Sequence, residues 1–202
     1  MPLSTSAEVE ASIISWTNAG ISSAQAQDLM TLAEDRIYRD IRTRQMEAST
    51  ALTITNSVAT VPSDMAEVKN AYIDTNPDYS LLRKSPEWIR QNYPDSSSSG
   101  IPIYFAREGS NFIFGPSPSS SYTLTVNYWK RPVSCVGGTL TGILASSPGL
   151  LLYAALSESE PFLGRDQRTA VWEQKYQQLK EIVQREDRNE RFSGSPLNVT
   201  PA

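Results

Sequence analysis

The sequence predicts an α+β protein in which N- and C-terminal helices form one helical bundle and a small antiparallel β module is inserted between them. Apolar residues recur every three or four positions near both ends of the 202-residue chain, whereas the middle alternates between apolar and polar residues and is divided by turns. Because chain ends often meet in space, residues 1–47 and 143–192 are expected to pack together. Residues 48–142 form the predicted module, and 193–202 a flexible C-terminal tail.

Two helices are predicted before residue 47. Thr5 or Ser6 can cap the first helix, and Gly20 is expected to end it. Ser22 or Ser23 can cap a second, longer helix, since an apolar stripe at spacings of three and four follows. The stripe consists of Leu29, Leu32, Ala33, Ile37 and Ile41.

The middle of the chain predicts short strands and one short helix. Asn56-Ser57 separates two alternating runs, which favours a tight hairpin turn. Ser85 followed by Pro86 indicates a helix start, with the helix running to about Tyr93. The remaining strand candidates are residues 67–74, 103–107, 112–114 and 122–130.

Two further helices are predicted after Gly142. Pro148 can open one, Pro161 and Gly164 end or bend it, and Asp166 can cap the last helix. Its apolar side is expected to hold Val171, Trp172, Tyr176, Leu179, Ile182 and Val183. Across the bundle, the side chains expected to be buried are Trp16, Leu29, Ile37, Leu152, Leu156, Trp172 and Tyr176.

The composition argues against an enzyme. The chain has no histidine, so it holds no His-containing catalytic triad and no His-ligated metal site. Its one cysteine, Cys135, cannot form an internal disulfide, and without a histidine partner it is interpreted as an inert thiol. The serines and glycines form neither a GxSxG elbow nor a phosphate-binding loop. We therefore expect no catalytic residue, no cofactor and no metal.

The charges give no overall reason to expect nucleic-acid binding. The net charge is −4, and residues 48–142 carry seven acidic and seven basic side chains. Asp35/Arg39, Arg36/Asp40 and Asp40/Arg44 are each four positions apart, the spacing of salt bridges on one helix face. These arginines are therefore assigned to a solvated or inter-subunit face rather than to DNA.

Aromatic residues gather in the middle of the chain. A stacking surface for single-stranded nucleic acid would use them, but it also needs a basic groove, and only Arg107, Lys130 and Arg131 lie close in sequence. A β core with a subunit interface is the better interpretation. The residues are Tyr93, Tyr104, Phe105, Phe112, Phe114, Tyr122, Tyr128 and Trp129.

No membrane segment or signal peptide is predicted. The longest strongly apolar run, residues 149–156, is far shorter than the roughly 18–20 residues that a membrane helix needs. The first ten residues lack a basic start followed by an apolar run. We therefore expect a soluble protein.

Several stretches, taken in order, resemble the head–tail adaptor (connector) proteins of short-tailed bacteriophages and related prophages. They include LAEDRIYRDIRTRQME at 32–47, VPSDMAEVKNAYID at 61–74, SPEW at 85–88, SGIPIYFAREGSNFIFGPSP at 99–118, YTLTVNYWKRP at 122–132 and LLLYAALSESEPFLGRDQRTAVWEQKY at 150–176. The resemblance covers about residues 30–192. It departs from the family pattern at Met65, where an aromatic residue often follows Pro-x-Asp.

The resemblance implies a structural virion protein without catalytic residues. It implies a homo-oligomeric ring, twelve subunits in the family, beneath the portal protein and around a channel through which DNA passes without sequence-specific binding. Tail or nozzle proteins would bind below the ring. The expected location is the head–tail interface of the virion, after synthesis in the bacterial host cytoplasm.

Charged helix ends and the tail supply the candidate contacts with other subunits or the portal. These are Arg36, Arg39, Arg42, Arg44, Arg185, Arg188, Arg191, Phe192, Leu197 and Val199. The alternative hypothesis is a cytoplasmic, non-enzymatic binding module that contacts nucleic acid. Portal-dependent assembly into a large particle would separate the two.

Overall fold

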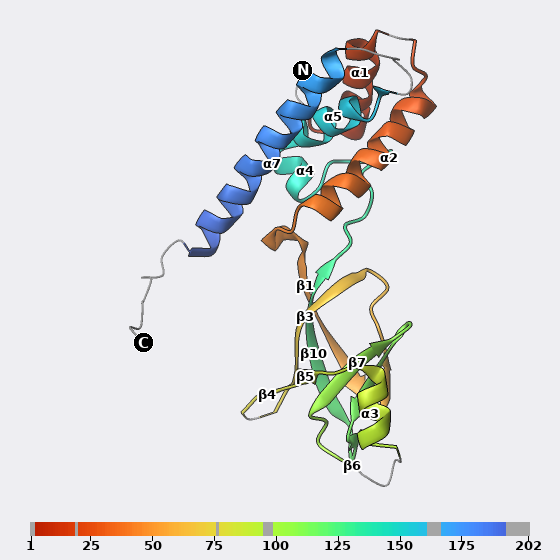
Figure 1. The fold of residues 1–202 in the computed structure, drawn as a ribbon, viewed down its shortest axis with the longest axis vertical. Helices are drawn as coiled ribbons and strands as arrows, with labels where there is room; N and C mark the ends of the chain where they lie inside the picture. Colours follow the sequence, from red (N-terminus) through yellow and green to blue (C-terminus); the bar gives the residue numbers. More distant parts are fainter. Residues whose placement is uncertain (1–2, 19, 76, 95–98, 161–166, 193–202) are drawn as a thin grey trace. The chain divides into compact units, whose positions relative to one another are not determined.

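The chain folds as an α+β protein, with a bundle formed by its N- and C-terminal helices and an inserted antiparallel β module, which confirms the predicted fold class (Figure 1). The computed structural model describes residues 3–18, 20–75, 77–94, 99–160 and 167–192. The chain divides into two compact units, a helical unit (Met1–Met46 with Pro132–Ala202) and a β unit (Glu47–Arg131). Each unit has its own apolar core.

The helical unit is built around one short, apolar helix. Its described helices are α1 (Ser6–Thr17), α2 (Ser23–Asp40), the 3-10 turn η1 (Arg44–Met46), α4 (Ile143–Ser146), α5 (Pro148–Ser157) and α7 (Arg168–Phe192). The sequence of α5, PGLLLYAALS, is apolar on nearly every side, so this helix can be covered all round. It packs against α1, α2, α4 and α7, as Figure 1 shows.

The starts of α1 and α2 follow from local sequence. Thr5 and Ser22 are the N-caps, and in each case a capping box joins the cap to the third helical residue. The first helix ends before the predicted Gly20, because Asn18 takes the left-handed conformation with φ of 48° at the C-cap. Short-range hydrogen bonds therefore set the starts of both helices, and the left-handed Asn18 sets the end of the first.

Most of the predicted bundle core is buried. Leu29, Ile37, Leu152, Leu156, Trp172 and Tyr176 are all buried in the core of the helical unit. The prediction was wrong for Trp16, which is 44% exposed and packs edge-on against Tyr153 with 6.0 Å between ring centroids. Leu32 is also exposed, because it lies about 100° around α2 from the buried Ala33.

The β unit contains two four-stranded sheets and one two-stranded pair. In the first sheet the antiparallel order is β1 (Glu47–Ile54), β10 (Tyr122–Lys130), β3 (Met65–Ile73) and β4 (Tyr79–Ser80). The second has the order β2 (Val58–Thr60), β8 (Asn111–Gly115), β7 (Tyr104–Glu108) and β5 (Leu82–Arg83), with β5 and β7 parallel. Strands β6 (Ser99–Gly100) and β9 (Ser117–Pro118) form a parallel pair.

The predicted hairpin at Asn56-Ser57 was wrong. Strand β1 pairs with β10, whereas β2 pairs with β8, so the chain passes from one sheet to the other at this turn. Alternation identifies a strand and its buried face, but it does not identify the partner strand. Ile54 from one sheet and Phe112 from the other belong to the same apolar core.

The short helix α3 (Pro86–Asn92) begins where the sequence predicted. Ser85 is the N-cap, accepting a hydrogen bond from the Trp88 amide, and Pro86 opens the helix. Tyr93 follows the helix and lies directly on Gly115, where an added Cβ would be 2.6 Å from the tyrosine ring. This close approach explains why a glycine is needed in β8.

Residues 132–142, which the sequence placed in the β module, group with the helical unit. Cys135 and Leu140 are buried in the helical core, and the Ser6 amide donates to the Gly138 carbonyl oxygen at 3.1 Å. Thr5 and Thr139 form an isolated antiparallel bridge. The segment has no helical periodicity, so only these long-range contacts assign it to the helical unit.

Candidate subunit-contact site

Charged side chains of α2 and α7 join these two helices within the chain. Arg36 donates to Glu158 at 3.0 Å and to Glu173 at 2.6 Å, and its guanidinium lies 4.4 Å from the centre of the Tyr176 ring. Asp40 accepts from the Tyr176 hydroxyl at 3.0 Å and from Lys180 at 3.3 Å. The sequence had instead predicted salt bridges along α2.

The same pattern continues beyond the end of α2. Arg44 pairs with Asp187 at 3.7 Å and with Glu190, both on α7. The Arg44 amide also donates to Asp187 at 2.8 Å. Among the described residues, the predicted pairs Asp35/Arg39, Arg36/Asp40 and Asp40/Arg44 do not form. Sequence spacing gave the right type of interaction and the wrong partners.

Burial and pairing shift the ionisation of this network. Burial raises the pKa of Glu173, but hydrogen bonds from Arg36 and Gln177 outweigh that effect and lower the pKa overall. Burial, with the nearby Asp40 carboxylate, raises the pKa of Tyr176 well above its ordinary value. The network therefore keeps Glu173 ionised and Tyr176 protonated at neutral pH.

Other predicted contact arginines remain at the surface. The side chains of Arg39, Arg42, Arg185 and Arg188 are exposed. The backbone carbonyls of Asp35 and Tyr38 accept from Arg39 and Arg42, respectively. Arg191 pairs with Asp187 at 3.1 Å, and Phe192 ends α7, while Leu197 and Val199 lie outside the described residues.

Two recesses flank the C-terminal part of α7. The acidic recess, about 240 Å³, is lined by three carboxylates and one guanidinium, beside the apolar Ile143, Ile182 and Val183. Its charged residues are Arg44, Glu186, Asp187 and Glu190. The basic recess, about 300 Å³, is lined by Gln184, the carboxylates of Asp40 and Asp187 and the guanidinium groups of Arg42, Arg188 and Arg191.

The candidate contacts predicted from the sequence were arginines and three apolar residues, so they did not include the carboxylates of the acidic recess. The signal was present in the spacing of Glu186 and Glu190, which are four positions apart and therefore lie on one side of α7. The apolar part of the recess could not be predicted from α7 alone, because Ile143 belongs to α4.

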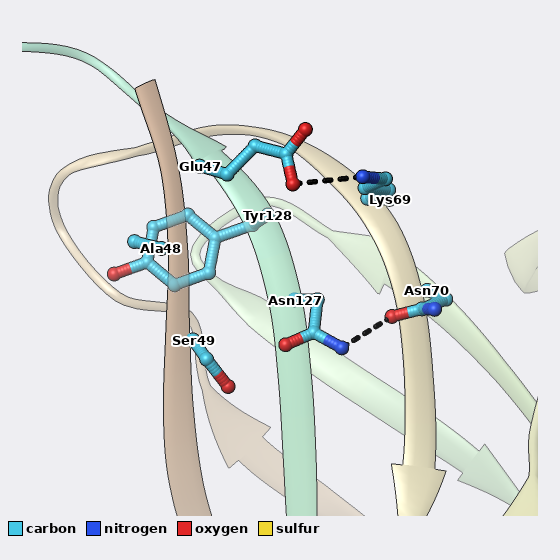
Figure 2. Close-up of a pocket in the computed structure, with 7 residues that line it drawn as sticks. All are labelled: Glu47, Ala48, Ser49, Lys69, Asn70, Asn127 and Tyr128. Carbon is cyan, nitrogen blue, oxygen red and sulfur yellow. Dashed lines mark hydrogen bonds and ion pairs between the residues drawn. The ribbon is translucent and has the colours of Figure 1, made fainter. Parts of the chain in front are cut away.

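The outer face of the first sheet carries a polar recess of about 380 Å³, shown in Figure 2. Lys69 donates to Glu47 at 2.8 Å, and Asn127 donates to Asn70 at 2.7 Å. Because these polar side chains pair with one another, the recess is a hydrogen-bonded sheet surface without a convergent set of ligand groups.

One buried carboxylate holds residues 134–135. Glu34 is 3% exposed and accepts from the Ser134 hydroxyl at 2.6 Å and from the Cys135 amide at 2.7 Å. Burial first, and then the Glu34 carboxylate, raise the pKa of the Cys135 thiol to about 12. The thiol is thus protonated at neutral pH, as an inert cysteine would be.

The described ranges hold neither a metal-type cluster nor a membrane-spanning helix. Within them, no group of three or more His, Cys, Asp or Glu side chains is arranged to hold a metal ion. No helix among the same residues is long and apolar enough to span a membrane.

Trp88, Tyr93 and Tyr104 form a cluster of edge and tilted ring contacts in the β unit, with Trp88 and Tyr104 centroids 4.8 Å apart.

Comparison with known proteins gives one family. The sequence pattern of the family described as "SU10 adaptor protein" matches residues 4–200, which is almost the whole chain. No curated protein matches the chain significantly. Adaptors of this kind are structural phage proteins. The chain belongs to the SU10 adaptor protein family and is a structural adaptor of a bacteriophage particle.

Proposed function

We propose that this adaptor assembles into a ring, of twelve subunits, beneath the portal protein and joins the head to the tail around the DNA channel. The family match over residues 4–200 is the observation that carries the proposal. The ring would receive tail or nozzle proteins on its lower face, and DNA would pass through it without sequence-specific contacts. The location that follows is the head–tail interface of the virion.

The exposed arginines of the helical unit are the proposed contacts with the portal or with neighbouring subunits. Arg39, Arg42, Arg185 and Arg188 are the strongest candidates, because their side chains are exposed. Arg36 and Arg44 are poorer probes, since each already pairs with carboxylates of the same chain. Replacing either would disturb the helical unit as well as any interface.

Assembly on the portal tests the function directly. The purified chain is mixed with the portal protein of the same phage, and the mass of the complex is measured by light scattering and native mass spectrometry. A complex with twelve adaptor copies, seen by cryo-electron microscopy as a ring below the portal, is the expected result. A chain that stays monomeric and does not bind the portal would contradict the proposal.

The contact assignment is tested by Arg39→Glu, with Lys175→Glu as the matched control. Both side chains are exposed, on α2 and α7 respectively, so neither change should unfold the chain. Arg39→Glu is expected to weaken portal-dependent assembly, whereas Lys175→Glu leaves it unchanged. Equal assembly by both variants would assign Arg39 to an ordinary solvated face.

The C-terminal tail is proposed as a further portal or neighbour contact. Residues 193–202 include Leu197 and Val199 as apolar anchors among small polar residues, a composition that suits a segment ordered on a partner. Deleting these residues should leave the chain folded and weaken its binding to the portal. Unchanged portal affinity would show that the tail makes no energetically important contact.

A further inference from the structure

The two recesses beside the C-terminal part of α7 carry opposite charge and lie on different sides of the helix. Glu186 lines the acidic recess and Arg188 lines the basic recess. Two positions along a helix correspond to about 200° of rotation, so these side chains point to nearly opposite sides of α7. One helix therefore presents an acidic surface and a basic surface in different directions.

The acidic recess has the chemistry that a long cationic side chain needs. Ile182, which is 38% exposed, forms part of an apolar floor with Ile143 and Val183, on which an arginine stem can lie. Glu186 is an exposed carboxylate at the edge of this floor, and no ion pair of Glu186 forms within the described ranges. The guanidinium of such a side chain would meet the carboxylate there.

A second, independent observation lies at the same recess. Thr43 lines it and is 4% exposed, yet its hydroxyl oxygen has no hydrogen-bond partner in the part of the chain that the structure describes. A buried hydroxyl without a partner is uncommon and costs stability. A donor brought to the recess by another molecule would lower that cost.

The basic recess supplies the matching group. Arg188 is exposed and, within the described ranges, pairs with no carboxylate, while Arg42 lies beside it in the same recess. A ring forms when one surface of a subunit binds a different surface of the next subunit. The two recesses carry opposite charge and, although Asp187 lines both, they face different directions around α7, so they satisfy that condition.

We propose that the acidic recess of one subunit packs against the basic recess of a second copy of this chain. The Arg188 side chain of that second copy enters the acidic recess. The proposal rests on the proposed ring, and it names the surfaces that meet in it. Arg188 would lie across Ile182, with its guanidinium against Glu186, and Arg42 would approach the outer edge of the same recess. Each subunit would use its acidic side toward one neighbour and its basic side toward the other.

Paired charge reversals provide the test. Variant A is Arg188→Glu and variant B is Glu186→Arg, and the controls are the exposed Lys175→Glu and Asp28→Arg. Circular dichroism and thermal unfolding first establish that all four variants are folded. Ring formation with the portal protein is then followed by light scattering and native mass spectrometry.

The expected pattern depends on which subunits are mixed. Alone, A places two carboxylates, and B two guanidinium groups, at the contact between positions 186 and 188 of neighbouring subunits. The concentration needed for half-maximal assembly therefore rises about tenfold or more for each. In an equimolar mixture every contact between A and B is again complementary, and assembly recovers. The double variant E186R/R188E also assembles alone, and both controls behave as the wild type.

The outcomes separate this proposal from the proposed function. If the wild type forms the ring and A and B do so equally well, the assigned surfaces are wrong while the adaptor function stands. If A and B fail and their mixture also fails, charge complementarity between the recesses is overturned. If the wild type itself stays monomeric with the portal, the ring is overturned, and this proposal with it.

Discussion

At the scale of single residues, partners far away in sequence decide what each charged side chain does. Arg36 bridges Glu158 and Glu173 and lies over the Tyr176 ring, so it joins α2 to α5 and α7. Arg39, three positions along, is exposed. Two arginines of one helix thus serve different purposes, one in stability and the other in the proposed contact.

Replacing Arg36 should destabilise the chain. Arg36→Leu is expected to lower the free energy of unfolding by about 1–2 kcal/mol, since the pairs are only partly buried and solvent weakens them. Arg39→Leu, at an exposed position, should change it by less than about 0.5 kcal/mol. Urea unfolding measures both, and equal effects would show that the Arg36 pairs contribute nothing specific.

The pKa of Glu173 predicts a dependence on pH. Its pKa is lower in the folded chain than in the unfolded chain, so the stabilisation from this group is present above the unfolded value of 4.5 and is lost as pH falls through the folded value. Glu173→Gln should therefore lose stability at neutral pH and show a smaller further loss on acidification. Parallel stability–pH curves for the two proteins would contradict this assignment.

Cys135 should be nearly unreactive in the folded chain. Raising the thiol pKa from 9.0 to about 12 lowers the thiolate fraction at pH 8 by about a thousandfold, and the side chain is also buried. A thiol reagent such as Ellman's reagent should react slowly with the native chain and rapidly in denaturant. Fast native labelling would mean that the contact with Glu34 opens readily.

At the scale of elements, boundaries follow from hydrogen bonds between residues three or four positions apart. The capping boxes at Thr5 and Ser22 and the cap at Ser85 lie where side chains of those types were expected to begin helices. Strand pairing does not follow from such local interactions. The alternation of apolar and polar residues predicted that β1 and β2 are strands, but it did not predict that they pair with β10 and β8. The nearest strand in sequence was the wrong partner.

The Ser22 cap should contribute measurably to stability. Ser22→Ala is expected to cost about 1 kcal/mol, because the Gln25 amide loses its acceptor. Ser15→Ala, an exposed site inside α1, is the matched control and should have little effect. Chemical unfolding of both variants checks the expectation, which fails if Ser22→Ala is as stable as the wild type.

At the scale of the whole molecule, the chain has two separate apolar cores. The helical unit is built around α5, and the β unit around side chains that both four-stranded sheets supply, among them Leu124 and Phe112. A compact unit with its own core can lose structure without its neighbour. The two units are therefore expected to respond separately to core substitutions.

Removing a large side chain from the β core tests that independence. Phe112 is fully buried, so Phe112→Ala should destabilise the β unit by about 3–5 kcal/mol. Amide hydrogen exchange should accelerate in β7, β8 and β10 while α2 and α5 keep their protection. Equal acceleration in both units would show that they unfold as one.

The sequence alone indicated the longer helices and strands, and it contains no histidine for a His-dependent catalytic set. Caps, apolar spacing and alternation act within about four residues, so the sequence records them directly. It placed Trp16 in the core wrongly, because apolar character does not specify which other element covers a side chain.

Only the tertiary structure decided which distant groups meet. Arg36 and Glu173 are 137 positions apart, and Glu34 and Cys135 are 101 apart, so no local pattern could pair them. The same holds for the acidic recess, which combines η1, α4 and α7. Contacts of this kind depend on how whole helices pack, and that packing minimises the exposed apolar area of the entire unit rather than of any one segment.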